Sequence, residues 1–119
     1  MTEKWNSKRY DLEDRTLAFT KRVISFINGI ARTISNVEIA KQLIRSAGSV
    51  GANYIEVNES LGKKDFLFHI RISRKEAKET QYWLQLIECP EQLKEEQMNL
   101  IQETTELMKI FGAIVEKSK

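Results

Sequence analysis

The sequence has few of the residues that interrupt long helices. Its 119 residues include one proline and five glycines, whereas 41% are hydrophobic and 30% are charged. This composition favours long helices over the strands and turns of a β fold. A chain of this length forms one domain around one hydrophobic core. We therefore expect a single all-α domain.

Cysteine and histidine are almost absent, and this excludes several kinds of site. Cys89 is the single cysteine and has no disulfide partner within the chain, as expected in a reducing compartment. His69 is the single histidine, whereas zinc sites take several Cys or His ligands. The residue three before it is Phe66, so the Glu-x-x-His pair of a di-iron bundle is missing. We predict no metal, no cofactor and no catalytic residue, and we interpret His69 as a surface or interface histidine.

Long apolar runs and an excess of charge of one sign are also missing. No stretch approaches the roughly 18 apolar residues of a membrane-spanning helix. Residues 1–15 contain no apolar segment of the kind found in secretory signals. The net charge is only +2, from 19 basic and 17 acidic residues, which neither requires nor excludes a nucleic-acid partner. We expect a cytoplasmic protein with no membrane association.

What the sequence does contain is a helical period in four segments. Apolar and small residues recur at alternating steps of three and four, the spacing of left-handed bundle packing. The connections are short, which makes neighbouring helices antiparallel. We predict an all-α, antiparallel up-down four-helix bundle. Its four seams consist of Leu12, Thr16, Phe19, Val23, Phe26 and Ile30; Ala40, Leu43, Ala47, Val50, Tyr54, Val57 and Leu61; Phe66, Ile70, Ser73, Ala77, Thr80, Leu84 and Ile87; and Leu93, Gln97, Leu100, Thr104, Leu107, Phe111 and Ile114.

Local signals set the expected ends of the helices. Ser35 and Asn36 are alternative N-caps of the second helix. Pro90 ends the third helix and suits the first turn of the fourth. The expected connections are roughly Gly29 to Ser35, Leu61 to Lys63 and Cys89 to Glu91, and the third helix is expected from about Lys64 to Glu88. Residues 1–10, polar around Trp5 and Tyr10, are interpreted as an N-terminal arm, either disordered or docking on a partner, and residues 11–119 as the bundle.

Three of the predicted helices carry more apolar surface than one core requires, since a stripe about 100° wide is enough. The additional residues are Ile44, Gly48, Gly51 and Ile55; Phe68, Ile72, Tyr82, Trp83 and Leu86; and Ile101, Met108 and Val115. A glycine in mid-helix costs about 1 kcal/mol relative to alanine, and close helix packing would offset that cost. The surface is interpreted either as a broad core face or as contact with another subunit. We predict a homo-oligomer.

Basic residues are concentrated in the third predicted helix. Residues 63–78 contain six basic and two acidic residues, a local excess of +4. The basic residues are Lys63, Lys64, Arg71, Arg74, Lys75 and Lys78. The last four are spaced 0, 3, 4 and 7 along the helix and therefore share one face, which can neutralise phosphates. The alternative is a solvated face whose charges pair with Glu79 and the acidic fourth helix.

A polar strip on the second predicted helix is the other unusual feature. Its members are Arg45, Ser49, Ala52, Glu56 and Glu59, with Asn53 beside them. Arg45 is expected to pair with a carboxylate of the third helix, either Glu76 or Glu79. The strip is interpreted either as ordinary surface or as a polar network that fixes the register of the helices.

Three stretches resemble a known family: YDLEDRTLAF (10–19), KQLIRSAGSVGANYIEVNE (41–59) and KKDFLFHIRISRKEAKETQYWL (63–84). They are similar to bacterial four-helix-bundle proteins encoded in the intervening sequences of large-subunit (23S) rRNA genes, once described as ribosomal-protein-like. The resemblance covers residues 10–87. The matching positions are Arg45, Ser46, Ser49, Gly51, Asn53, Glu56, Asp65, Lys75, Glu76, Glu79, Tyr82 and Trp83.

The resemblance implies a ring-like homopentamer and carries over no catalytic residue. It also implies a relation to the accessory protein of diversity-generating retroelements, which uses a basic surface to bind nucleic acid and a reverse transcriptase. We therefore expect a non-enzymatic oligomer that binds nucleic acid, structured RNA in preference, through the basic face of the third helix. The alternative is a protein-interaction scaffold with no nucleic-acid role.

Overall fold

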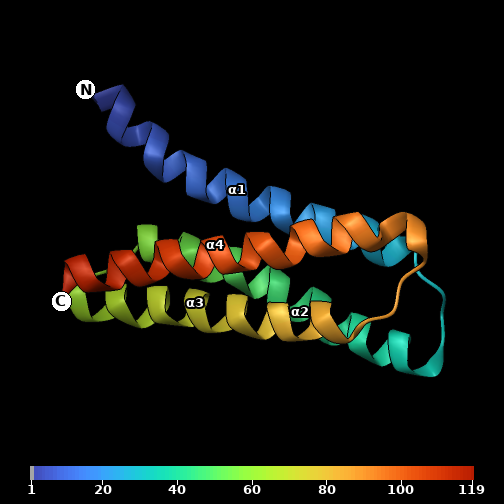
Figure 1. The fold of residues 1–119 in the computed structure, drawn as a ribbon. Coiled ribbons are helices and arrows are strands. Elements are labelled where there is room, and N and C mark those ends of the chain that lie inside the picture. The colour runs from blue at the N-terminus through green and yellow to red at the C-terminus, as the bar shows by residue number, and fades with distance from the viewer. Residues whose placement is uncertain (1) are drawn as a thin grey trace.

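The computed structural model describes the backbone of residues 2–119 and the side chains of residues 12–119. The chain forms four helices: α1 (Thr2–Asn28), α2 (Ile34–Asn58), α3 (Lys63–Leu86) and α4 (Lys94–Ser118). A short 3₁₀ turn, η1 (Glu91–Leu93), precedes α4, and no strand occurs in residues 2–119. Consecutive helices run in opposite directions (Figure 1). The predicted all-α, up-down four-helix bundle is confirmed.

The core consists of the predicted seams. Each helix contributes buried apolar residues at steps of three and four. The largest buried side chains include Phe19, Phe26, Leu43, Ile70, Leu84, Leu100, Leu107 and Phe111. Hydroxyl groups on the seams are buried too, and they join helices: Ser73 Oγ donates to the Val50 carbonyl at 3.0 Å, and Thr80 Oγ1 donates to Ser46 Oγ at 2.9 Å. Small hydroxyl residues at these positions therefore allow α2 and α3 to pack closely while their polar atoms stay bonded.

Two predicted seam positions differ in the structure. Leu61 is 94% exposed, because α2 ends at Asn58 and Leu61 lies in the following loop. On α4, Val115 is buried and Ile114 only partly so, since the core step after Phe111 is four residues rather than three. Neither difference changes the topology of the bundle.

The helix ends also differ from the prediction by a few residues. Thr33 is the N-cap of α2, because its Oγ1 accepts from the backbone NH of Asn36 at 3.1 Å. Gly62, with φ of +122°, is the N-cap of α3, a conformation that L side chains rarely adopt. Pro90 precedes η1 instead of lying in the first turn of α4. The ends of these helices are therefore set by the capping residues and by the backbone angles at the caps.

Helix α1 begins at Thr2, not at residue 11. Its first half diverges from the other three helices (Figure 1). The predicted boundary between an arm (1–10) and the bundle is therefore not a helix boundary, and the division itself stays a prediction. The side chains of Trp5 and Tyr10 lie outside the described residues.

Helix α3 occupies the central position among the four. It packs along both α2 and α4, whereas α1 packs mainly on α2 and touches α4 less extensively. One long face of α3 is left open to solvent as a result. Among the described residues, no helix is both long and apolar enough to cross a membrane.

Candidate nucleic-acid interface

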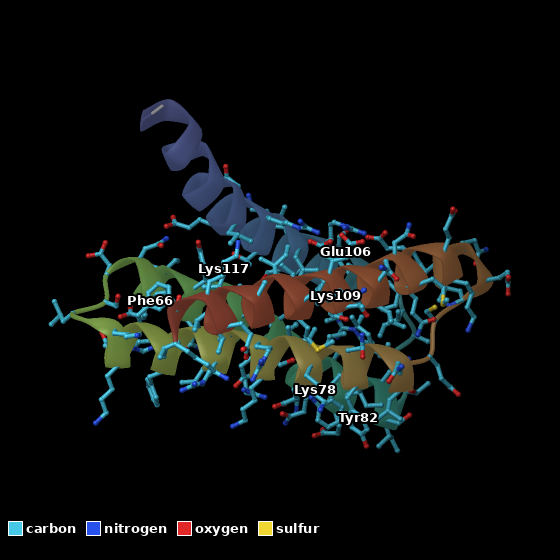
Figure 2. The ribbon with its side chains drawn as sticks, turned by 60° about the vertical axis from the view of Figure 1, so that its left-hand side comes forward. Phe66, Lys78, Tyr82, Glu106, Lys109 and Lys117 are labelled. Carbon is cyan, nitrogen blue, oxygen red and sulfur yellow. The ribbon has the colours of Figure 1, made fainter. Side chains whose placement is uncertain are left out.

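The six basic residues of α3 all lie on the surface of the molecule. Lys63 and Lys64 begin the helix, and Arg71, Arg74, Lys75 and Lys78 follow on its solvent side. They are exposed, whereas Ile70, Ser73 and Ala77 between them are buried. Figure 2 shows Lys78 one turn before Tyr82, on the edge of α3 that faces away from α1. We call these six residues the α3 basic face.

Three acidic residues of α4 form ion pairs with α1 rather than with α3. Arg15 Nε lies 2.7 Å from Glu103 Oε2, and Arg15 Nη2 lies 2.8 Å from Glu106 Oε1. Arg22 Nε lies 3.0 Å from Glu96 Oε2. Hydrogen bonds to these carboxylates raise the pKa of both arginines. The alternative in which α4 carboxylates neutralise the α3 cations is therefore wrong for these three acids.

No ion pair within residues 12–119 involves a member of the α3 basic face. Arg74 differs from the rest because it reaches toward α4. A Cβ added to Gly112 would lie 3.7 Å from Arg74 Nη1 and 4.0 Å from its Cδ. The other five cations are exposed and form no ion pair, although the charge of Lys75 also acts on Glu79, whereas Arg74 covers part of α4.

A shallow hollow lies within this face. It is lined by three cations and two apolar residues: Lys64, Phe68, Arg71, Ile72 and Lys75. Phe68 is 58% exposed, and its ring meets the His69 ring edge-on with centroids 5.0 Å apart. The sequence prediction counted Phe68 only as extra apolar surface. Phe68 lies four residues after Lys64 and three before Arg71, a spacing that places the three side chains next to one another on a helix. This spacing could have identified the hollow from the sequence.

The predicted pairing of Arg45 with α3 is confirmed. Arg45 Nη1 lies 3.5 Å from Glu76 Oε1, and Arg45 Nη2 contacts Glu79 Oε2. Glu79 also accepts from Trp83 Nε1 at 3.0 Å. The hydrogen bond from Trp83 and then that from Arg45 lower the pKa of Glu79 below its ordinary value. Arg45 therefore neutralises the two carboxylates next to the α3 basic face.

The remaining polar residues of α2 form a second link to α3. Asn53 Nδ2 donates to the Ser49 carbonyl at 2.9 Å and to Ser49 Oγ at 3.0 Å. Asn53 Oδ1 faces His69 Nδ1 at 3.3 Å, and His69 Nε2 faces Asp65 Oδ1 at 3.3 Å. His69, expected at a surface or interface, is thus held by two side chains. Glu56 is exposed and has no ion pair within residues 12–119.

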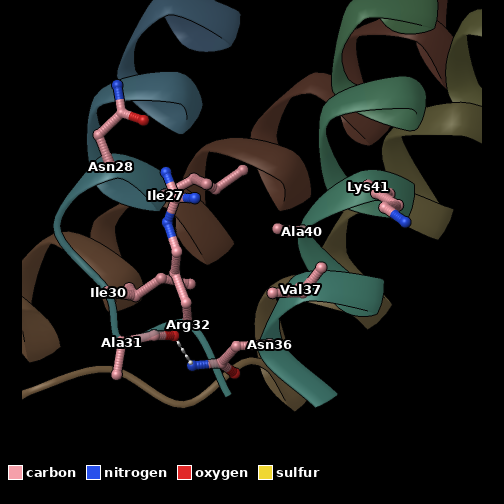
Figure 3. Close-up of a pocket in the computed structure, with 9 residues that line it drawn as sticks. All are labelled: Ile27, Asn28, Ile30, Ala31, Arg32, Asn36, Val37, Ala40 and Lys41. Atoms are coloured by element: carbon pink, nitrogen blue, oxygen red, sulfur yellow. Dashed lines mark hydrogen bonds between the residues drawn. The ribbon is translucent and has the colours of Figure 1, made fainter. Parts of the chain in front are cut away.

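A second hollow lies between the end of α1 and the start of α2 (Figure 3), and its polar groups hold the chain connection in place. Asn36 is buried there, and its Nδ2 donates to the carbonyls of Ala31 and Glu88, both at 3.0 Å. Its Oδ1 accepts from the Glu88 backbone NH at 3.1 Å. Asn36 thus ties the α1–α2 connection to the end of α3, and its polar atoms are all occupied.

Among the described residues, no group of three or more His, Cys, Asp or Glu could hold a metal ion.

Comparison with known proteins gives matches over most of the chain. The sequence model of the family described as 23S rRNA-intervening sequence protein matches residues 8–113. A crystal structure of a protein of unknown function from the S23 ribosomal protein family of Bacteroides thetaiotaomicron is similar, with a TM-score of 0.77 and 28% sequence identity. That likeness covers 92% of this chain and 98% of the other. No curated protein matches.

Proposed function

The chain belongs to the family of 23S rRNA-intervening sequence proteins, and from this premise we propose that it is a non-enzymatic, oligomeric, cytoplasmic protein that binds nucleic acid. The proposed ligand is structured RNA in preference, and the proposed contact surface is the α3 basic face. Binding through side-chain charges to phosphates is electrostatic and only weakly dependent on sequence. The family's link to rRNA genes supports this choice but names no ligand.

The observation that carries the proposal is the unpaired state of the α3 cations. Residues 63–78 have a local excess of +4, and no carboxylate among residues 12–119 forms an ion pair with the six cations. Cations that are already paired must lose a partner before they bind a phosphate, whereas free ones only release counterions. Two acids of the same helix, Glu76 and Glu79, are occupied by Arg45.

Assembly would multiply this charge. Exposed apolar side chains follow one side of α1 and α2: Leu17, Ile24, Ile44 and Ile55. We call these four residues the α1–α2 apolar strip. A symmetric oligomer built on such a surface repeats each copy's basic face around an axis and strengthens the field felt by an anionic ligand. A homopentamer is the assembly that the family resemblance suggests.

The test is a titration of RNA and DNA at several salt concentrations. Arg71→Glu with Lys78→Glu should abolish binding and leave helicity and assembly unchanged, because both side chains are exposed and outside the core. The slope of log K against log salt should shrink by about 0.7–0.9 for each phosphate that the variant no longer neutralises. Lys94→Glu with Lys109→Glu is the matched control, since it makes the same change of charge at exposed positions of α4, outside the α3 basic face and the α1–α2 apolar strip.

Two results would contradict the proposal. One is an assembled protein that binds neither RNA nor DNA at low salt. The other is equal loss of affinity in the α3 variant and in the control, which would mean that only the net charge matters. In either case the second candidate function, a protein-interaction scaffold, is preferred, because the α1–α2 apolar strip provides a docking surface without any nucleic acid.

A further inference from the structure

We propose that the hollow around Phe68 holds an unpaired base, so that the α3 basic face prefers single strands, loops and bulges to continuous duplex. This inference rests on the proposed function and narrows its ligand. Proteins that bind single strands combine a positively charged surface for the backbone with aromatic rings on which bases stack. In a duplex the bases are stacked inside, and only phosphates and groove edges are accessible.

The hollow has the composition that such a ligand requires. Phe68, the ring that faces solvent, is 58% exposed, and Ile72 forms apolar lining one turn further along α3. Lys64, Arg71 and Lys75 complete the lining at −4, +3 and +7 from Phe68, positions that share one side of a helix. No carboxylate lines the hollow. An apolar surface edged by cations alone presents a stacking face beside phosphate-binding groups.

The same charges argue against the other occupants of an apolar surface. An apolar side chain of a partner would remove water from three cations without pairing them, which is unfavourable. A second copy of the chain that docked here by a symmetric contact would bring its own Lys64, Arg71 and Lys75 against these three. A nucleotide supplies both groups that are missing: a flat ring for Phe68 and a phosphate for the cations.

A second exposed ring extends the surface along α3. Tyr82 is 55% exposed and lies 14 residues after Phe68, close to four helical turns and about 21 Å along the axis. Its ring is braced by Trp83, with centroids 5.0 Å apart. Arg71, Lys75 and Lys78 lie on α3 between the two rings. A single strand that follows the helix would therefore meet a stacking ring at each end and cations between them.

The experiment compares a mixed-sequence RNA strand of about 20 nucleotides with the blunt duplex that it forms with its complement. Phe68→Ala should lower the affinity for the single strand by about 5- to 150-fold and leave the affinity for the duplex unchanged. Its salt slope should stay that of the wild type, because the same phosphates are neutralised. Phe68→Trp should restore binding, since it keeps a flat ring at the position. Leu86→Ala, which removes another exposed apolar side chain of α3, is the matched control and should bind like the wild type.

The outcomes separate this inference from the proposed function. If Phe68→Ala lowers the affinity for strand and duplex equally, or for neither, the hollow takes no base, while the proposed function stands. A salt slope that shrinks more in Phe68→Ala than in Leu86→Ala would also overturn it, because stacking releases no counterions. Circular dichroism of the variants verifies that helicity is kept, as expected for a side chain on the solvent face. If the wild type binds no RNA at low salt, the proposed function fails first.

Discussion

Gly48 and Gly51 lie three residues apart in α2 but have different surroundings. A Cβ added to Gly51 would lie 3.1 Å from Oγ1 and 3.3 Å from Cβ of Thr16, a buried residue of α1. A Cβ added to Gly48 would meet nothing within 4 Å. Gly51 therefore allows α1 to approach α2 closely, whereas packing within the chain gives no reason for glycine at position 48.

Alanine at the two positions should have different effects on stability. Gly48→Ala should raise the free energy of unfolding of the single chain by about 1 kcal/mol, the usual gain in helix propensity. Gly51→Ala should be the less stable of the two, because its methyl group must displace the buried Thr16. Urea unfolding followed by circular dichroism at low protein concentration measures both. Equal gains would show that the contact between α1 and α2 at Gly51 is loose.

Glu79 gives the fold a predictable response to acid. Its pKa is lowered by the hydrogen bond from Trp83, which is the largest cause, and then by Arg45. Because the folded pKa lies below the unfolded one, these contacts stabilise the fold above the ordinary value of 4.5, and this stabilisation disappears as pH falls through the lowered pKa. As the pH falls from the ordinary value of 4.5 through the lowered pKa, the wild type should therefore lose more thermal stability than Glu79→Gln. Parallel melting curves against pH would contradict this role.

At the level of residues, a contact between helices was predictable when a long charged side chain makes it and was missed when short polar side chains make it. Arg45 was expected to reach Glu76 or Glu79 because long charged side chains tolerate small errors of register. The partners of His69 were not predicted, because Asn53 comes within hydrogen-bond distance only once α2 and α3 are aligned. The hollow around Phe68 was missed because exposure depends on which face of α3 the neighbouring helices cover.

Helix α1 is attached to the bundle in two ways that differ along its length. Phe19, Val23 and Phe26 are buried in the core. Toward α4, the attachment is polar and depends on Arg15 and Arg22. Ion pairs that are partly exposed contribute up to about 1 kcal/mol each and are weakened by salt. The contact between α1 and α4 should therefore be the most salt-sensitive helix contact of the fold.

Replacing both arginines tests this attachment. Arg15→Met with Arg22→Met keeps helix propensity and side-chain length but removes the pairs with Glu103, Glu106 and Glu96. Backbone amides of α1 should exchange hydrogen faster, while those of α3 keep their protection. Lys41→Met, which removes a pair with Glu38 inside α2, is the control and should change neither. Uniformly faster exchange in all helices would mean that α1 is not a separate unit of stability.

The number, order and core faces of the helices followed from the sequence, since a period of three and four is repeated in every segment. The residues at which the helices begin and end were predicted less accurately from the sequence. Thr33 caps α2 with its hydroxyl, and Gly62 begins α3 with a positive φ, yet Ser35 and Asn36 looked equally suitable as caps. Leu61 fitted the period of α2 but lies beyond the end of the helix. Periodicity does not indicate where a helix stops, because that depends on backbone geometry in the loop.

The two surfaces that the proposals use lie on different parts of the whole molecule. The α1–α2 apolar strip is on the first two helices, and the basic face is on α3, which packs between α2 and α4. Where α1 meets α2, beside the strip, Thr16 lies next to Gly51 and Thr20 Oγ1 donates to the Ala47 carbonyl at 3.1 Å. This antiparallel register brings Ile24 to the level of Ile44. Assembly through the strip would therefore leave the α3 basic face of each copy accessible.

A charge placed in the strip should separate the copies. Ile24→Asp with Ile44→Asp puts two carboxylates at one level of the proposed contact, so the mass measured by light scattering should fall to that of the 13.9 kDa chain. Met98→Asp, at an exposed apolar position on α4, is the control and should leave the oligomer intact. Gly48→Ala should weaken assembly in the same assay, because Gly48 lies one turn from Ile44 and an added methyl group would project from the chain beside the proposed contact.

The separated copies then test whether assembly serves binding. A single chain presents a local excess of only +4 on α3, whereas an oligomer presents that excess from every copy to one ligand. The Ile24→Asp, Ile44→Asp variant should therefore bind RNA more weakly and with a smaller salt slope than the wild type, while the Met98→Asp control keeps both. A dissociated variant with wild-type affinity and slope would show that each copy binds alone, and that the strip serves another purpose. An unchanged mass would place the contact between copies on a different surface, because two buried carboxylates facing each other are not tolerated in an apolar interface.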